Sequence, residues 1–320
     1  MNLEGLISIR KAITTLNPKQ AREMSERPLH IALHAPDEGS YQRMENFLLQ
    51  DLSVTRRHES ALLLSRLGAP AAPKNPDLAI YHETLAAPAQ SLVFHPGRPQ
   101  ALVERALSRH PDLAVALAKS FVPFRRPFVE KVIAKTSREN TLFSLATALP
   151  DIIPSAIELP WALAEFASDT AFLTMNQVRM AFLIAAASDR EVGYFDQKSE
   201  IATVIGSAFG WRALARQLVG KIPFGGGLVA KAAVAYAGTK VLGYSLERFY
   251  AIGFTYSREE RDHIYADALR QGKKVALKIL ALIRPDLAAK YGSGNSVPPR
   301  SNGAAASSAS FELASRPLDS

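Results

Sequence analysis

The 320-residue sequence contains no cysteine. This absence excludes disulfide bonds, thiolate nucleophiles and zinc sites built on thiolates, and it fits a reducing compartment. The first ten residues have no basic start followed by an apolar core, so we expect no secretory signal. No Ser-His-Asp arrangement or carboxylate pair can be argued from residue spacing. We therefore predict a protein without enzymatic activity and without a cofactor.

Long apolar runs free of charge are also missing. A membrane-spanning helix needs about 20 largely apolar residues. Between residues 141 and 253 the longest charge-free run is Ile201 to Trp211. The window Ile222 to Leu246 has only Lys231 and Lys240 as charges, and each costs about 2.5–3.5 kcal/mol at the bilayer centre. We expect no ordinary lipid-exposed span; the alternative is a hairpin or bundle whose charges lie near the interfaces.

What the chain does have is apolar content and an uneven positive charge. Hydrophobic residues make up 48%, enough for a packed core, and the length predicts two domains. Of the net charge of +8, segments 121–141 and 255–291 carry +3 each, whereas 28–120 and 142–254 are neutral. Such basic segments are attracted to anionic lipid by about 1 kcal/mol per Lys or Arg, and they are equally ordinary as solvated helix faces. No basic cluster is interleaved with aromatic residues, so we expect no nucleic-acid partner.

The order of elements predicts a mostly helical α+β protein. Short strands are expected at Leu29–Leu33, Asp77–Tyr81 and Ser91–Phe94, with helices at Tyr41–Gln50, Pro99–Arg109 and Asp112–Phe121. This alternation is typical of a small parallel or mixed sheet with covering helices. Pro123–Pro127 is interpreted as the boundary to the helical part. The predicted regions are a helical segment over 1–27, an α/β module over 28–120, a helical domain over 121–291 and a disordered tail over 292–320.

The helix expected after Pro127 is basic on one side. Lys131, Lys135 and Arg138 follow at spacings of four and three and therefore share a face. Four apolar residues lie largely away from that face: Phe128, Val129, Val132 and Ile133. A basic amphipathic helix is suited to a membrane surface. We favour the alternative, in which the helix packs on its own domain with its lysines in water.

Further helices are expected to Leu149 and over Ser155–Ser188, Lys198–Val219 and Leu228–Ala251. One stripe of the second collects Glu165, Asp169, Asn176 and Arg179. This stripe is either a polar pathway or buried switch, or it has a structural role: a set of core hydrogen bonds and ion pairs that fixes helix register, or simply the solvated face of the helix. We favour the structural role. Ala235, Thr239 and Gly243 form a small-residue stripe that permits close helix approach, in lipid or in a tight soluble bundle. A last helix starts near Ser257 with a capping box.

Five motifs occur in order along the chain: Ala116–Lys119 with Pro123–Arg125, Leu173–Met180, Trp211–Arg216, Ile222–Gly225 and Ala235–Thr239. Together they resemble a bacterial family of unknown function, related to YcjF-type membrane proteins and often fused behind small Ras-like GTPase domains. The similarity covers about residues 112–254. It implies a helical, membrane-associated domain, and a GTPase as a candidate partner. We interpret ten motif residues as structural: Asn176, Gln177, Trp211, Arg212, Arg216, Pro223, Gly225, Tyr236, Gly238 and Thr239.

That resemblance directs attention to a phosphate-binding loop in the N-terminal module. The loop needs G-x-x-x-x-G-K-[ST] between a strand and a helix. With Gly39 as the second glycine, His34 stands in place of the first. Ser40 and Tyr41 stand where the lysine and the magnesium ligand belong, and Asp37–Glu38 add negative charge where phosphates would lie. We predict a degenerate GTPase-like or unrelated α/β module that hydrolyses no nucleotide.

Histidines are the remaining chemical candidates, because six of the seven lie within residues 30–110. His34, His82 and His95 each follow an expected strand. The carboxyl ends of parallel strands meet at one edge of the sheet, where these three side chains could bind a metal or anion. We favour ordinary loop histidines and predict no metal site.

From these observations we expect a non-enzymatic scaffold or regulator at the cytoplasmic side of the bacterial cytoplasmic membrane. One alternative is a soluble, cytoplasmic helical module whose apolar block binds a protein partner. The other is an enzyme with a nucleotide or metal site that the motifs do not reveal.

Overall fold

The computed structural model describes residues 17–66, 75–149, 169–202 and 227–292. Four parts of the expected elements lie outside these ranges: residues 1–16 of the helical segment 1–27, the first half of Ser155–Ser188, most of Lys198–Val219 and the tail from residue 293. The elements in chain order are α2 (Pro18–Glu26), β1 (Ile31–His34), α3 (Glu38–Leu48), α4 (Val54–Ala61), β2 (Leu64–Arg66), β3 (Leu78–His82), β4 (Leu92–Phe94), α5 (Pro99–Arg109), α6 (Ala114–Ser120), α7 (Val122–Ala146), α8 (Asp169–Ala187), α10 (Gly227–Ile252), α11 (Arg258–Ile283) and α12 (Pro285–Gly292).

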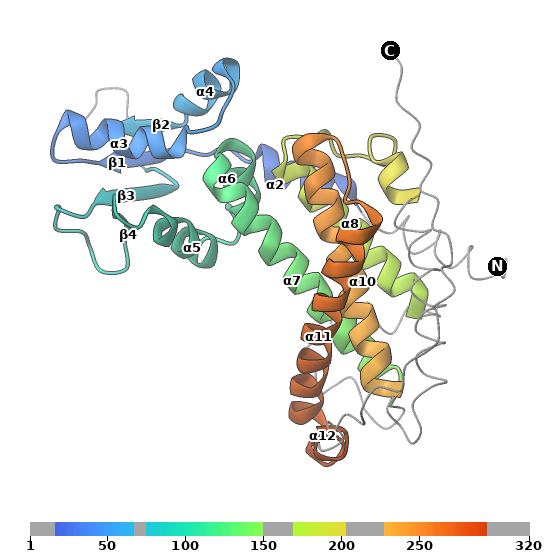
Figure 1. The fold of residues 1–320 in the computed structure, drawn as a ribbon. Helices are drawn as coiled ribbons and strands as arrows, with labels where there is room; N and C mark the ends of the chain where they lie inside the picture. Colours follow the sequence, from blue (N-terminus) through green and yellow to red (C-terminus); the bar gives the residue numbers. More distant parts are fainter. Residues whose placement is uncertain (1–16, 67–74, 150–168, 203–226, 293–320) are drawn as a thin grey trace.

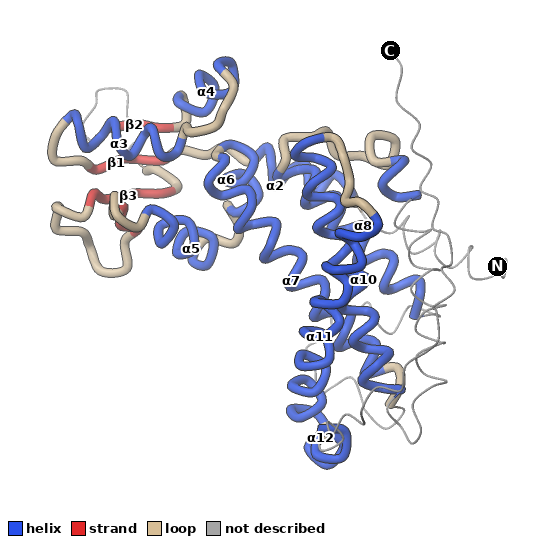
Figure 2. The backbone as a smooth tube through the Cα atoms, in the orientation of Figure 1, coloured by secondary structure: helices blue, strands red, loops and turns tan. Residues whose placement is uncertain are grey.

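The N-terminal module contains a four-stranded, wholly parallel sheet in the order β2-β1-β3-β4. A small parallel sheet in a mostly helical protein confirms the expected fold class. Three strands lie within one or two residues of their predicted positions. The fourth, β2, was not predicted, because Leu64-Ser65-Arg66 is too short to carry an alternating pattern. Figure 2 shows all described strands gathered in this module, while the rest of the described chain is helical.

This strand order places β1 beside β3, the arrangement of the first strands in flavodoxin-like sheets. Ile31, Leu33 and Ile80 are almost completely buried in the sheet. Helix α3 begins at Glu38, three residues earlier than predicted, because the Asp37 side chain caps its N-terminus. The carboxyl end of β1 is therefore followed by a short connection, residues 35–37.

The expected boundary at Pro123–Pro127 is not a break in the helix. Helix α7 starts at Val122, and only Phe121 separates it from α6. Pro123 lies in the first turn, where its missing N–H is not needed, and Pro127 removes one hydrogen bond further along. Phe121 and Phe124 are fully buried in the core that both parts share. Burial of these rings holds the helix together across the prolines.

The helical part is a bundle of α7, α8, α10 and α11, from whose end the α/β module projects (Figure 1). Helix α10 is central and packs against the other three. As predicted, its small-residue stripe permits a close approach: a Cβ on Gly243 would lie 2.6 Å from Cγ1 of Ile133 on α7. On the other side a Cβ on Gly272 of α11 would lie 2.8 Å from the Ala233 carbonyl oxygen of α10.

Two local predictions about the helices are confirmed. Ser257 and Glu260 form the capping box that starts α11, with both reciprocal hydrogen bonds present. On α7, Lys131, Lys135 and Arg138 are exposed, and the four apolar residues named with them are buried. In the described ranges we find no helix with the length and apolar character needed to span a membrane.

Candidate functional site

Two of the resemblance motifs, Leu173–Met180 and Ala235–Thr239, meet a segment of α7 in a buried polar cluster between α7, α8 and α10. The Thr239 hydroxyl accepts from Asn140 Nδ2 at 2.8 Å and from Gln177 Nε2 at 3.1 Å. Asn176 Nδ2 lies 2.9 Å from Asn140 Oδ1 and 3.1 Å from Glu139 Oε2. We call these five residues the polar layer.

Burial makes the polar layer energetically important. Asn140 and Thr239 are fully buried, and Asn176 and Gln177 are nearly so. Thr239 also donates its hydroxyl proton to the Ala235 carbonyl at 2.8 Å. A buried polar group that loses its hydrogen bond costs about 1–3 kcal/mol, so the bundle is most stable in the one register that joins these side chains. The layer therefore fixes how the three helices align.

The layer answers the question left open for the α8 stripe. Asn176 lies in a hydrogen-bonded cluster, as the favoured interpretation predicted, whereas Arg179 is exposed. Asp169 lies at the start of α8, and Glu165 lies outside the described residues. Not every atom is satisfied: Gln177 Oε1 is buried without a hydrogen-bond partner within the described part of the chain. The polar layer thus has a structural role, and among the described residues one of its buried oxygens, Gln177 Oε1, accepts no hydrogen bond.

Sequence reasoning missed Glu139 and Asn140. The signal was present, since α7 carries an unbroken polar run from Thr136 to Thr141 although it is a core helix. In that run Thr136, Ser137, Asn140 and Thr141 are buried. Polar residues that recur on the buried side of a helix need partners, and only the packing of α8 and α10 identifies which partners they meet.

The other motif residues on α10 lie next to this layer. Gly238 is buried, and Tyr236 is 6% exposed, with a pKa that burial raises above its usual value. The Lys240 ammonium lies over the Tyr236 and Tyr244 rings at 5.8 and 5.6 Å and donates to Gln271 on α11 at 2.6 Å. Burial lowers the pKa of Lys240. Five motif residues lie outside the described ranges: Trp211, Arg212, Arg216, Pro223 and Gly225.

The three histidines do lie at the carboxyl edge of the sheet, but each has its own neighbour. The His34 ring stacks on Tyr81 with centroids 4.0 Å apart. His95 Nδ1 lies 2.7 Å from Glu83 Oε2. His82 is 4% exposed, and its Nδ1 lies 2.9 Å from the Thr84 hydroxyl. Over the described residues, no group of three or more His, Asp or Glu side chains is placed to hold a metal ion.

The place of a phosphate loop is occupied by a carboxylate. Asp37 Oδ1 accepts from the Ser40 amide at 2.7 Å, and Oδ2 accepts from the Ser40 hydroxyl at 3.0 Å. These hydrogen bonds hold the pKa of Asp37 below its usual value. A phosphate bound at a helix N-terminus uses the same backbone amides. Here the amide is already occupied by a negative group that would repel phosphate.

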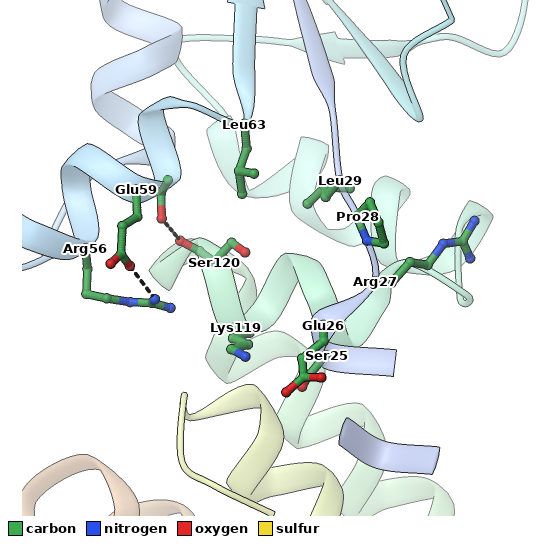
Figure 3. Close-up of a pocket in the computed structure, with 11 residues that line it drawn as sticks. Ser25, Glu26, Arg27, Pro28, Leu29, Arg56, Glu59, Leu63, Lys119 and Ser120 are labelled. Atoms are coloured by element: carbon green, nitrogen blue, oxygen red, sulfur yellow. Dashed lines mark hydrogen bonds and ion pairs between the residues drawn. The ribbon is translucent and has the colours of Figure 1, made fainter. Parts of the chain in front are cut away.

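A small cavity of about 270 Å³ lies at the seam between the module and the bundle (Figure 3). The C-terminal ends of α2, α4 and α6 border it, through Ser25–Glu26, Ser60 and Lys119–Ser120. Helix C-termini carry partial negative charge, which favours the three cations of the lining, Arg27, Arg56 and Lys119; Glu26 and Glu59 line the cavity as well. Arg56 bridges Glu59 at 2.7 Å and Asp189 at 2.9 Å, so it joins α4 to the end of α8.

Arg125 completes this seam. Its Nε donates to the Ala187 carbonyl at 2.9 Å, and its Nη2 donates to the Lys119 carbonyl at 3.3 Å. One guanidinium therefore caps the C-termini of α6 and α8. The Ser60 hydroxyl adds a bond to the Ser120 carbonyl at 2.9 Å. The polar groups of the seam are largely paired with one another. These pairs hold the α/β module against the helical bundle.

Comparison with known proteins found no matching family model, no similar curated protein and no similar solved structure. The resemblance to the YcjF-type family therefore stays a prediction that rests on the motifs.

Proposed function

We propose that this chain is a non-enzymatic scaffold that associates with the cytoplasmic surface of the bacterial cytoplasmic membrane and presents its α/β module to a protein partner. The observation that carries the proposal is that apolar side chains and exposed cations lie on different helices of the bundle. The apolar helices α8 and α10 are buried against protein, whereas cations on α7 and α11 point to solvent. Such a molecule is suited to bind an anionic lipid surface from outside.

The rigid character of the bundle supports a scaffold. The polar layer fixes helix register, and the close approaches at Gly243 and Gly272 leave α10 little room to move. The paired seam connects the module to the bundle. A GTPase remains the candidate partner that the family resemblance implies.

Fractionation of the protein at its native level tests the proposal. We expect the chain in the membrane fraction, released by high salt, because headgroup contacts are screened by salt. Release by detergent alone would point to insertion. Recovery in the soluble fraction at low salt would refute membrane association.

A soluble interaction module is the second candidate, and a specific feature favours it. Phe254 and Ile252 at the end of α10 are 74% and 56% exposed, and Phe195 is 92% exposed. Arg190 donates to the Tyr250 carbonyl at 3.2 Å, which brings the segment after α8 to this end of α10. Exposed apolar residues that gather at one end of a bundle are typical of a protein-binding surface.

A further inference from the structure

The C-terminal half of α11 has an unusual distribution of charge. From Ala268 to Ile283 it contains four cations and no acidic residue. The cations are Arg270, Lys273, Lys274 and Lys278, all exposed, and we call them the α11 basic face. They extend over about 12 Å of helix at 1.5 Å per residue. This segment lies outside the region of family resemblance, so its charge pattern is an independent observation.

The packing of α11 fixes which way these cations point. Ala268, Gly272, Ala276 and Leu280 recur every four residues and are all buried. Their stripe packs on α10, and at Gly272 the two backbones approach closely. Residues two positions away from such a stripe lie on roughly the opposite side of a helix. Arg270, Lys274 and Lys278 therefore point away from α10, and the exposed Lys273, next to Gly272, lies at the edge of the basic face.

The cations of the α11 basic face are largely unneutralised. Arg270 is paired with Asp267. Lys273, Lys274 and Lys278 have no ion pair or hydrogen bond with any described residue. Next to them, Leu282 is 86% exposed. An outward surface of uncompensated cations beside an exposed leucine matches the boundary between lipid headgroups and acyl chains.

The other basic helix is arranged differently. On α7, Lys131 donates to the Ser108 hydroxyl of α5 at 2.9 Å. Lys135 lies 3.9 Å from Glu139, and Glu130 is exposed on the same helix. These contacts occupy two of the three α7 cations, Lys131 and Lys135, and place negative charge beside them. Of the two basic segments, α11 thus has more charge available for a partner.

We propose that the α11 basic face is the surface by which this chain docks on anionic phospholipid. The inference rests on the proposed function, since it identifies which side of the molecule meets the membrane. Charge complementarity favours lipid phosphate as the occupant. Single-stranded nucleic acid is a poorer fit because residues 268–283 contain no aromatic side chain to stack on bases.

Binding of the full chain to vesicles tests the docking surface. The probes are phosphatidylcholine vesicles with and without phosphatidylglycerol, and the test variant is Lys273→Gln with Lys274→Gln and Lys278→Gln. The matched control removes three positive charges from α7 instead: Lys131→Gln, Lys135→Gln and Arg138→Gln. Each cation near an anionic surface contributes about fivefold to binding, so we expect the α11 variant to lose roughly a hundredfold in affinity. We expect the α7 control to lose no more than about fivefold.

The outcomes separate the two proposals. If the parent binds anionic vesicles and the α11 variant binds equally well, or both variants weaken equally, α11 is not the docking surface although membrane association stands. If the parent does not bind anionic vesicles, both proposals fall. Tighter binding to duplex DNA than to vesicles at the same salt concentration, lost in the α11 variant, would overturn lipid as the occupant. Unchanged melting temperatures of both variants would show that folding is intact.

Discussion

Asn140 on α7 donates its amide to the hydroxyl of Thr239 on α10 across 2.8 Å, and the two residues are 99 positions apart in the chain. Both are fully buried. Gln177 on α8 donates to the same hydroxyl, so one oxygen connects three helices. Only one alignment of the bundle satisfies these donors, and this makes Thr239 the most informative position to change.

Replacing Thr239 by valine keeps the shape of the side chain and removes the hydroxyl. The amides of Asn140 and Gln177 then lose an acceptor in a buried site, where each unpaired donor costs about 1–3 kcal/mol. We expect Thr239→Val to lower the free energy of unfolding by about 2–4 kcal/mol, measured by chemical denaturation.

Ser245→Ala is the matched control on the same helix. Among the described residues, the Ser245 hydroxyl bonds only to the Val241 carbonyl, four residues earlier. Its removal leaves no buried donor unpaired, so we expect a change within about 0.5 kcal/mol. A Thr239→Val variant as stable as this control would mean that the polar layer does not hold the bundle.

A methyl group at Gly243 is expected to destabilise the bundle. It would lie 2.6 Å from Cγ1 of Ile133, and such overpacking costs about 1–3 kcal/mol, against a gain of about 1 kcal/mol in helix propensity. Adding Ile133→Ala removes the clashing atoms, so the double variant should lose less than the sum of the two single losses. Additive losses in a double-mutant cycle would show that the two positions do not touch.

Gly97→Ala provides the reference for that experiment. A Cβ at Gly97 would meet nothing within 4 Å. The melting temperature of this variant should equal or slightly exceed that of the parent, because the added methyl group lies in open space and alanine restricts the unfolded chain more than glycine does.

Glu247 on α10 gives the protein a specific pH dependence. Burial raises its pKa above 4.5; Glu130 adds to the rise, and Arg126 opposes it. The folded state therefore binds this proton more tightly than the unfolded state, and stability falls as pH rises from about 4.5 through the folded pKa. Glu247→Gln removes this effect. We expect the variant to melt higher than the parent at pH 7, with the difference disappearing below pH 4.5.

Thermal unfolding of both proteins at pH 4 and pH 7 checks this prediction. Glu247→Asp is the control, because it keeps a carboxyl group in nearly the same place. A Gln variant less stable than the parent at pH 7 would mean that attraction to Arg126 outweighs the cost of burying the carboxylate.

Local features were predictable because they depend on residues only a few positions apart. The capping box at Ser257 and Glu260 and the basic side of α7 involve spacings of three and four, which the helix itself brings together. The place of the histidines at one sheet edge also followed from sequence, since parallel strands must end on the same side. Prediction missed β2 because three residues carry too weak a pattern. It also placed a boundary at Pro127, where the burial of neighbouring aromatic rings outweighs the helix-breaking tendency of proline and α7 continues.

By itself, the sequence determined the helical character of the chain, the absence of thiol chemistry and the positions of its cations. The tertiary structure decided what these residues meet. Asn176, Gln177 and Thr239 share a cluster with Asn140, while Lys273, Lys274 and Lys278 are exposed on a helix whose buried side packs on α10. The physical reason is that hydrogen bonding within a helix acts over four residues, whereas contacts between helices depend on packing of the whole chain.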